Sequence, residues 1–261
     1  MYSSVIGILL FAVSVSNANT GQIFADEDEY TAPRSATIGT SGATSIRVEA
    51  RAGTLRIEGR EGITEARASG TARASSKSLL EDIKLVAERE GNEVVIRVEI
   101  PEMNGGWGWN RMAALDLLIE VPTTIALDVS DSSGDAEVRG VASLDIEDSS
   151  GNLHVEKIGG AVRIHDSSGD ITVRDSRGDV VIDDSSGGID VREVGTLTIE
   201  RDSSGEIEAT RVAGAVIVRS DGSGGIDVDD VGGDFTVRKD GSGGISYNNV
   251  KGTVDIPRRK R

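Results

Sequence analysis

Asp166-Ser167-Ser168-Gly169-Asp170-Ile171-Thr172-Val173 is one copy of a unit that recurs through the second half of this chain. Its opening motif, Asp-Ser-Ser-Gly or Asp-Gly-Ser-Gly, starts at Asp131, Asp148, Asp166, Asp184, Asp202, Asp221 and Asp240. The intervals between these aspartates are 17, 18, 18, 18, 19 and 19 residues. A short motif repeated at a nearly fixed interval indicates structural units stacked on one another.

Between the motifs, polar and apolar residues alternate in two short runs, as in Ile171 to Val173 and Val180 to Ile182. Alternation rich in β-branched residues predicts strands. One such unit cannot bury a face alone, whereas wound units share one core in which each Ile or Val contributes about 1.5–3 kcal/mol. The array predicts an all-β fold: a single-stranded parallel β-helix over residues 126–257, with about 18 residues per coil. Right-handed winding follows from the usual hand of parallel crossovers.

The motif itself is interpreted as a turn that repeats in a ladder, because Asp accepts backbone N–H groups and Gly adopts left-handed backbone angles. An alternative is a column of carboxylates that binds a cation such as calcium. The turn is favoured, because it needs no ion and neighbouring charges repel by only about 1 kcal/mol in water-like surroundings. The ladder residues are Asp148, Ser150, Gly151, Asp166, Ser168, Gly169, Asp184, Ser186, Gly187, Asp202, Ser204 and Gly205.

The second serine of the motif is present in all seven copies, whereas the first becomes Gly222 and Gly241. We therefore expect the second hydroxyl to point inward and to form hydrogen bonds along the stack, because a buried hydroxyl needs a partner. A serine that simply faces solvent is the alternative.

The units exemplified by Asp166 to Val173, and the run Leu115-Asp116-Leu117-Leu118-Ile119-Glu120-Val121-Pro122, resemble a known family. It comprises exported bacterial β-solenoids catalogued as "putative adhesins", related to autotransporter-adhesin head-like domains. The resemblance covers roughly residues 36–256. It implies a solenoid of the cell envelope and transfers no catalytic residue.

The first half of the chain carries less regular strands, and residues 36–125 are interpreted as degenerate opening coils or a capping sheet. Strands are expected at 45–50, 54–58, 63–74 and 93–100, with a short helical turn within 78–86. A solenoid end needs such a cover, because bare strand edges and an open core invite aggregation.

The two ends of the chain differ from the array. The apolar run from Val5 to Val15, followed by small residues, predicts a signal peptide over residues 1–18 with cleavage after Ala18. Residues 19–35 are polar and acidic and predict a disordered leader. Residues 258–261 form a basic tail. We therefore expect an exported protein of the periplasm or cell surface.

Trp107 and Trp109 lie in a Gly-rich interruption and are a candidate surface contact for a sugar or a protein. Alternatively, this loop folds over the open end of the solenoid. No catalytic, cofactor-binding or metal-binding residue is predicted, and the expected partner is an envelope protein or glycan of unknown identity. The net charge of −16 argues against nucleic acid.

Two other functions remain open. One is a polysaccharide-acting enzyme that uses paired outward carboxylates on successive coils, such as Asp190 and Glu208, about 5 Å apart. The other is a scaffold that polymerises end to end. Against both stands a non-enzymatic binding or structural module of the envelope.

Overall fold

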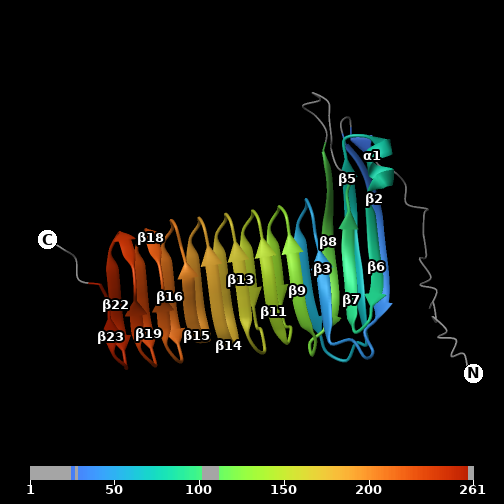
Figure 1. Ribbon diagram of the computed structural model, residues 1–261. Coiled ribbons are helices and arrows are strands. Elements are labelled where there is room, and N and C mark those ends of the chain that lie inside the picture. The colour runs from blue at the N-terminus through green and yellow to red at the C-terminus, as the bar shows by residue number, and fades with distance from the viewer. Residues whose placement is uncertain (1–24, 27–28, 102–111, 258–261) are drawn as a thin grey trace, which may run out of the picture.

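The structure is a computed structural model that describes residues 25–26, 29–101 and 112–257. Figure 1 shows an elongated body whose strands lie across its long axis, one coil beside the next. The parallel coils form a β-solenoid of about seven turns, repeating roughly every 19 residues. The predicted fold class is thereby confirmed.

Each coil contributes one strand to each of two faces. On the first face lie β9 (Ala126–Asp131), β11 (Ser143–Asp148), β13 (Val162–Asp166), β17 (Val216–Val218), β20 (Phe235–Val237) and β23 (Val254–Asp255). On the second lie β10 (Ala136–Arg139), β12 (Leu153–Glu156), β16 (Ile207–Val212), β19 (Ile226–Val231) and β22 (Ile245–Val250). The long strands β14 (Ile171–Asp184) and β15 (Ile189–Arg201) bend through both faces, and β18 (Asp221–Ser223) and β21 (Asp240–Ser242) form the Asp corner of the last coils.

Parallel pairing places equivalent residues directly over one another. Val162 and Ile164 of β13 pair with Val180 and Ile182 of β14, and these four side chains are at most 1% exposed. The aliphatic positions of both faces meet in a single core that runs the length of the solenoid. The predicted shared interior is therefore present.

The bend opposite the Asp corner has its own repeating geometry. A residue with left-handed backbone angles recurs there at Lys157, Asp175, Glu193, Arg211, Asp230 and Asn249, with φ between 49° and 59°. The next residue packs on the core; in five coils it is Ile or Val, whereas Ser176 is fully buried in the same column. The tight bend thus turns the chain while keeping an inward position filled.

The opening coils are stacked in an order that differs from their order in the chain. One coil comprises β3 (Ser45–Glu49) and β4 (Leu55–Arg60), and another comprises β7 (Glu93–Glu99) and β8 (Ala113–Pro122). Strand β3 pairs with β7 on one side and β9 on the other, and β4 likewise lies between β8 and β10. The earlier coil is therefore inserted between two later ones.

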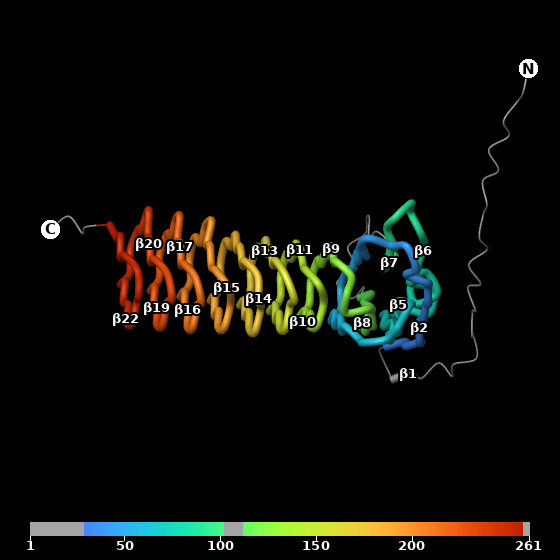
Figure 2. The backbone as a smooth tube through the Cα atoms, turned by 90° about the horizontal axis from the view of Figure 1, so that it is seen from below, coloured from blue at the N-terminus to red at the C-terminus, as the bar shows by residue number. Residues whose placement is uncertain are grey.

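Antiparallel strands close this end of the solenoid. Strand β2 (Glu29–Gly39) pairs with β1 (Ala25–Asp26) and with β5 (Glu65–Ala74), β5 pairs with β8, and β6 (Lys84–Glu90) pairs with β7. Figure 2 shows this group, which we call the cap, at one end of the regular coils. The short helix α1 (Lys77–Asp82) belongs to the cap, and no helix within the described ranges is long and apolar enough to cross a membrane.

The prediction of a disordered leader through Ser35 is wrong from Glu29 onward, because residues 29–35 belong to β2. The reason is a tertiary contact. Arg34 donates from Nε to the carbonyl oxygen of Ile83 at 2.8 Å and from Nη2 to that of Leu80 at 2.5 Å. These bonds pair carbonyl groups at the end of α1, where Leu80 also accepts the backbone N–H of the C-cap residue Ile83 at 3.4 Å. Residues 1–18, predicted to be a signal peptide, and the basic residues 258–261 lie outside the described residues.

The glycine that ends each corner motif should be irreplaceable, and Gly224 and Gly225 allow a matched test. A Cβ on Gly224, where φ is +142°, would lie 1.5 Å from the carbonyl oxygen of Gly205 in the preceding coil. Gly225 has no such φ, and its nearest neighbour would be 3.8 Å away. We expect Gly224→Ala to lower the free energy of unfolding by more than the roughly 1–3 kcal/mol of backbone strain.

Gly225→Ala should leave stability within about 1 kcal/mol of the parent. Thermal unfolding followed by circular dichroism compares the two variants. Equal unfolding midpoints for the two variants would show that the stacking of corners does not exclude a side chain at Gly224.

Candidate functional site

The aspartates of the corner motif point into the solenoid. In β11 the inward positions are Leu144, Ile146 and Asp148, and the same alternation continues in β13 through Ile164 to Asp166. Six of these side chains are between 0% and 4% exposed: Asp131, Asp148, Asp166, Asp184, Asp202 and Asp221. We call this set the aspartate column.

Register pairing aligns the column along the solenoid axis. Asp148 pairs with Asp131 on one side and with Asp166 on the other, and Asp166 pairs in turn with Asp184. Neighbouring parallel strands are about 4.8 Å apart. The carboxyl groups are therefore stacked at this spacing inside the protein. The expectation that neighbouring aspartates repel one another in water-like surroundings is wrong, because these side chains are buried.

In the middle of the column one oxygen of each carboxyl closes the turn and the other has no partner among the described residues, whereas both oxygens of Asp221 lack one. The Oδ1 atoms of Asp148, Asp166 and Asp184 accept the backbone N–H two residues later, at 3.1 to 3.2 Å. Their Oδ2 atoms are buried and make no hydrogen bond to any described residue. An ionised carboxylate with an unpaired buried oxygen is costly, so the environment favours the protonated acid.

Burial and the neighbouring charges both raise the pKa of the column. Burial, followed by the charge of Asp148, raises the pKa of Asp131 from 3.8 to about 7. Burial is also the largest cause at Asp148, Asp166, Asp184, Asp202 and Asp221, whose pKa values rise to about 6. Backbone N–H groups oppose the shift but do not cancel it. The column therefore takes up protons between pH 7 and pH 4.

The motif serines lie at the surface of the corner. Ser168 and Ser186 are half-buried, and each hydroxyl donates along the stack to the carbonyl oxygen of a first serine, at 3.3 and 3.2 Å. Ser150 does the same at 3.4 Å. The expected bonds along the stack are present, but the expected inward direction is wrong, because the aspartate two residues earlier fills that position.

The structure does not support the calcium alternative. Calcium takes about six to eight oxygen ligands at 2.3–2.6 Å. The corners of Asp131 to Asp202 each offer one unpaired carboxyl oxygen, and that of Asp221 offers two. No group of three or more His, Cys, Asp or Glu side chains in the described ranges is arranged to hold a metal ion. The column is a structural turn ladder with an unusual proton affinity.

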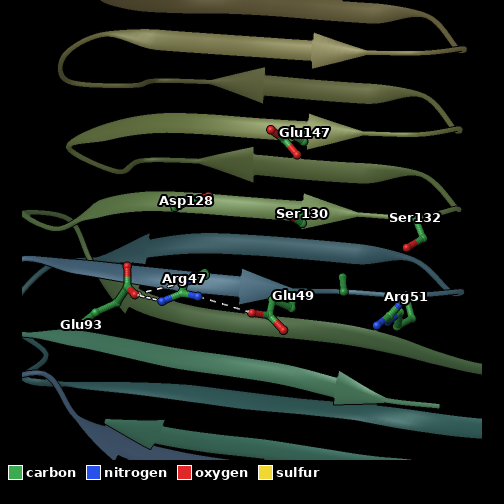
Figure 3. A pocket seen from close by; sticks show the side chains of 9 residues that line it. Arg47, Glu49, Arg51, Glu93, Asp128, Ser130, Ser132 and Glu147 are labelled. Atoms are coloured by element: carbon green, nitrogen blue, oxygen red, sulfur yellow. Dashed lines mark hydrogen bonds and ion pairs between the residues drawn. The ribbon is translucent and has the colours of Figure 1, made fainter. Parts of the chain in front are cut away.

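A second candidate lies on the outer surface, where the opening coils meet the array. Figure 3 shows this shallow depression, lined by Arg47, Glu49, Ala50, Arg51, Glu93, Asp128, Ser130, Ser132 and Glu147. Ala50 is the one apolar residue among them. The polar side chains come from β3, β7, β9 and β11 or from the turns that follow β3 and β9.

Arg47 organises the floor of this depression. Its Nε donates to Glu93 at 3.0 Å, and its guanidinium lies 3.7 Å from Glu49 and 3.5 Å from Glu90. The hydrogen bond from Arg47 is the largest cause of the lowered pKa of Glu93. Partial burial, followed by the charges of Asp145 and Glu93, raises the pKa of Asp128. Asp128 thus lies in a negative electrostatic potential, and a hydrogen-bond donor of a ligand would stabilise its carboxylate.

The remaining sequence candidates separate into two groups. Trp107 and Trp109 lie outside the described residues, so their role as a surface contact stays a prediction. Asp190 and Glu208 are register partners as expected. Arg192 bridges them, with Nε 2.7 Å from Asp190 and Nη2 3.0 Å from Glu208. This bridge occupies both carboxyl groups and disfavours their use as an acid–base pair.

Sequence reasoning identified the aspartate ladder but not its burial, and it missed the depression around Arg47. The inward direction of the aspartates was readable from the alternation, since Asp148 follows Leu144 and Ile146 at intervals of two residues. No sequence signal places Arg47 beside Asp128. The two residues are 81 positions apart in the chain, and only the insertion of the β3–β4 coil next to β9 brings them together.

The stability of this protein should rise on acidification. A folded-state pKa of about 6 against an ordinary value of 3.8 means that the folded chain binds more protons across this interval. The stabilisation is complete below about pH 4 and is lost as the pH rises through about 6. Glu58 and Glu93, whose pKa values are lowered, oppose it only below their ordinary value of 4.5. Thermal unfolding midpoints should therefore be higher at pH 5 than at pH 7.5; the reverse order would contradict the buried column.

An amide in the column should reproduce the effect of a proton. Asp166→Asn keeps the Oδ1 acceptor for Ser168 and removes the charge. We expect a gain of about 1–3 kcal/mol at pH 7.5, since each pKa unit corresponds to about 1.4 kcal/mol, and little gain at pH 4. Asp145→Asn, at a side chain that is 54% exposed, is the control and should change stability by less than about 0.5 kcal/mol. Denaturant midpoints at the two pH values measure both variants.

Comparison with known proteins finds no matching family model and no matching curated protein. Similar solved structures include a "putative adhesin" from Bacteroides fragilis, with 10% identity, a TM-score of 0.48, and coverage of 87% of this chain and 97% of that one. Another is a "putative cell adhesion protein" from Clostridium sporogenes, with 12% identity, a TM-score of 0.37, and coverage of 88% and 100%. A "putative lipid binding protein" from Parabacteroides distasonis has 14% identity, a TM-score of 0.43, and coverage of 85% and 96%. At such identities the names of these proteins assign no ligand to this chain.

Proposed function

We propose that this protein is an exported, non-enzymatic binding module of the bacterial cell envelope, and that the depression around Arg47 holds a glycan. The observation that carries the proposal is the lining of that depression: charged and hydroxyl side chains on four adjacent strands and turns, with a single apolar residue. Backbone hydrogen bonds between the parallel strands β7, β3, β9 and β11 fix the spacing of these side chains.

The chemistry of the lining favours a polyhydroxylated ligand. Arg47 and Arg51 supply N–H donors, the carboxylates supply acceptors, and serine hydroxyls supply both. Sugar hydroxyls also donate and accept, so they match such a mixture. An apolar lipid chain or apolar peptide side chain would find little surface to bury against. The aromatic pair Trp107 and Trp109 is a further predicted contact for the same ligand class.

Export rests on the sequence of the first eighteen residues. The apolar run Val5 to Val15 has the length of a signal-peptide core and is too short to span a membrane. Cell fractionation of the producing bacterium tests this part: the protein should be recovered in the periplasmic or surface fraction, shortened at its N-terminus. Recovery of the uncut chain in the cytoplasm would contradict it.

Arg51 allows a clean test of the depression. Its side chain is exposed and makes no ion pair with any described residue, so Arg51→Ala should not disturb the fold. Arg201→Ala is the control, because it removes an exposed arginine from the same face several coils away, where it pairs with Asp183 at 2.9 Å. We expect Arg51→Ala to weaken binding about tenfold, since a hydrogen bond from a charged group contributes roughly 1.5–3 kcal/mol.

The measurement is binding of the full chain to a panel of envelope glycans, with vesicles of phospholipid as a comparison probe. A glycan that binds the parent and the Arg201 variant equally, but the Arg51 variant more weakly, supports the site. Binding to vesicles alone, binding to no glycan, or equal loss in both variants would overturn it. Hydrolysis of a bound polysaccharide, lost in Asp190→Asn, would instead support the enzymatic alternative.

A further inference from the structure

The last described coil has one edge with which no described strand pairs. Strand β22 pairs with β19 and strand β23 pairs with β20, and neither has a second partner among the described residues. Their core-facing side chains are less buried than those of the coil before. Tyr247 is 47% exposed, whereas its register partner Val228 is fully buried. Strand edges of this kind recruit further strands.

Strand β22 of this edge has lost the charges that the inner coils carry, whereas β23 keeps Asp255, which lies 3.8 Å from Arg238. Asp227 and Asp229 of β19 pair in register with Ser246 and Asn248 of β22. The third aspartate of β19, Asp230, lies beside Asn249 of β22. Strand β22 contains no charged residue. The two asparagine amides already donate to Asp229 and Asp230, at 2.9 and 2.8 Å. The amide oxygen of Asn248 can accept from a next strand, whereas that of Asn249 already accepts from Lys251 Nζ at 2.6 Å.

Neutrality at the edge matters because the chain as a whole is acidic, with a net charge of −16. Two copies repel one another over most of their surfaces, and lining up one carboxylate against another about 4.8 Å away adds to that repulsion. A neutral strand removes this cost at one place. Uncharged polar ladders such as stacked asparagines favour strand pairing.

Among the described residues, the other end of the solenoid offers no matching edge. There the cap covers the opening coils with the antiparallel strands β2, β5 and β6 (Figure 2). A head-to-tail filament would require a bare parallel coil at both ends. The open end can instead meet the same end of a second copy, by a two-fold rotation that pairs strands antiparallel and closes the assembly.

We propose that the C-terminal coil is a homodimerisation surface, through which two copies join tail to tail by pairing β22 and β23 with the same strands of the partner. The dimer buries Tyr247 and completes the hydrogen bonds of the terminal strands. It presents two capped ends, and therefore two depressions, pointing in opposite directions. This inference does not depend on the ligand proposed above.

Restoring charge to the edge tests the proposal. The double variant Ser246→Asp/Asn248→Asp gives β22 the acidic residues that β19 carries, in the same columns. Thr172→Asp/Thr210→Asp is the matched control: it adds the same charges in the same two columns, on inner coils. Sedimentation of the full chain, from about 1 to 200 μM and at low and high salt, reports the mass.

We expect the parent and the control to double in mass with rising concentration, more readily at high salt because salt screens the repulsion of acidic surfaces. The edge variant should stay monomeric over at least a tenfold wider range of concentration. A monomeric parent at 200 μM, or a dimer that persists in the edge variant, overturns the proposal.

Hydrogen exchange provides a second readout that does not depend on a variant. Backbone amides of β22 should gain protection as the concentration of the parent increases, whereas amides of the inner strand β16 should not change. Protection of β22 that is independent of concentration would show that another segment or ligand covers the edge, and would also overturn the proposal.

Discussion

In-register stacking of parallel coils is the constraint on which the rest of this structure depends. Backbone hydrogen bonds between coils fix a spacing of about 4.8 Å, so every residue lies over its equivalent. Where the equivalents are Ile and Val, as in Ile164 over Ile182, stacking creates a continuous core. Where they are glycines, as in Gly205 and Gly224, stacking leaves no room for a Cβ. The stacking that builds the core therefore also restricts which residues can occupy the corners.

Stacking has its greatest energetic cost at the aspartate column. Asp166 lies between Asp148 and Asp184, fully buried, with an unpaired oxygen. A charged column of this kind would work against the surrounding core, and proton uptake relieves it. The corner motif therefore combines a turn that the fold needs with a carboxyl group whose protonation the fold favours. The acid stability expected from these raised pKa values belongs to the whole stack, because the charge of one carboxyl group raises the pKa of its neighbour.

The terminal strands are treated differently at the two ends of the solenoid: antiparallel strands cover one end, and the strands at the other end pair on one side only. At the N-terminal end the chain folds back as antiparallel strands, and Arg34 ties β2 to the end of α1. At the C-terminal end the last coil keeps its parallel pairing on one side and carries neutral residues on β22. A polar depression with fixed spacing lies near the capped end. The two proposals above assign a ligand to the depression near the capped end and a second copy to the open end.

The sequence by itself determined the repeat, its strands, the corner turns and the shared aliphatic core, because these follow from local alternation and from the interval between the aspartates. It also contained the inward direction of Asp148, which follows in phase after Leu144 and Ile146. Only the tertiary structure decided that β3 lies between β7 and β9, that Glu29 to Ser35 form a strand, and that Arg47 faces Asp128. These depend on contacts between segments distant in the chain, and local patterns of polar and apolar residues carry no information about which distant strand will be the neighbour.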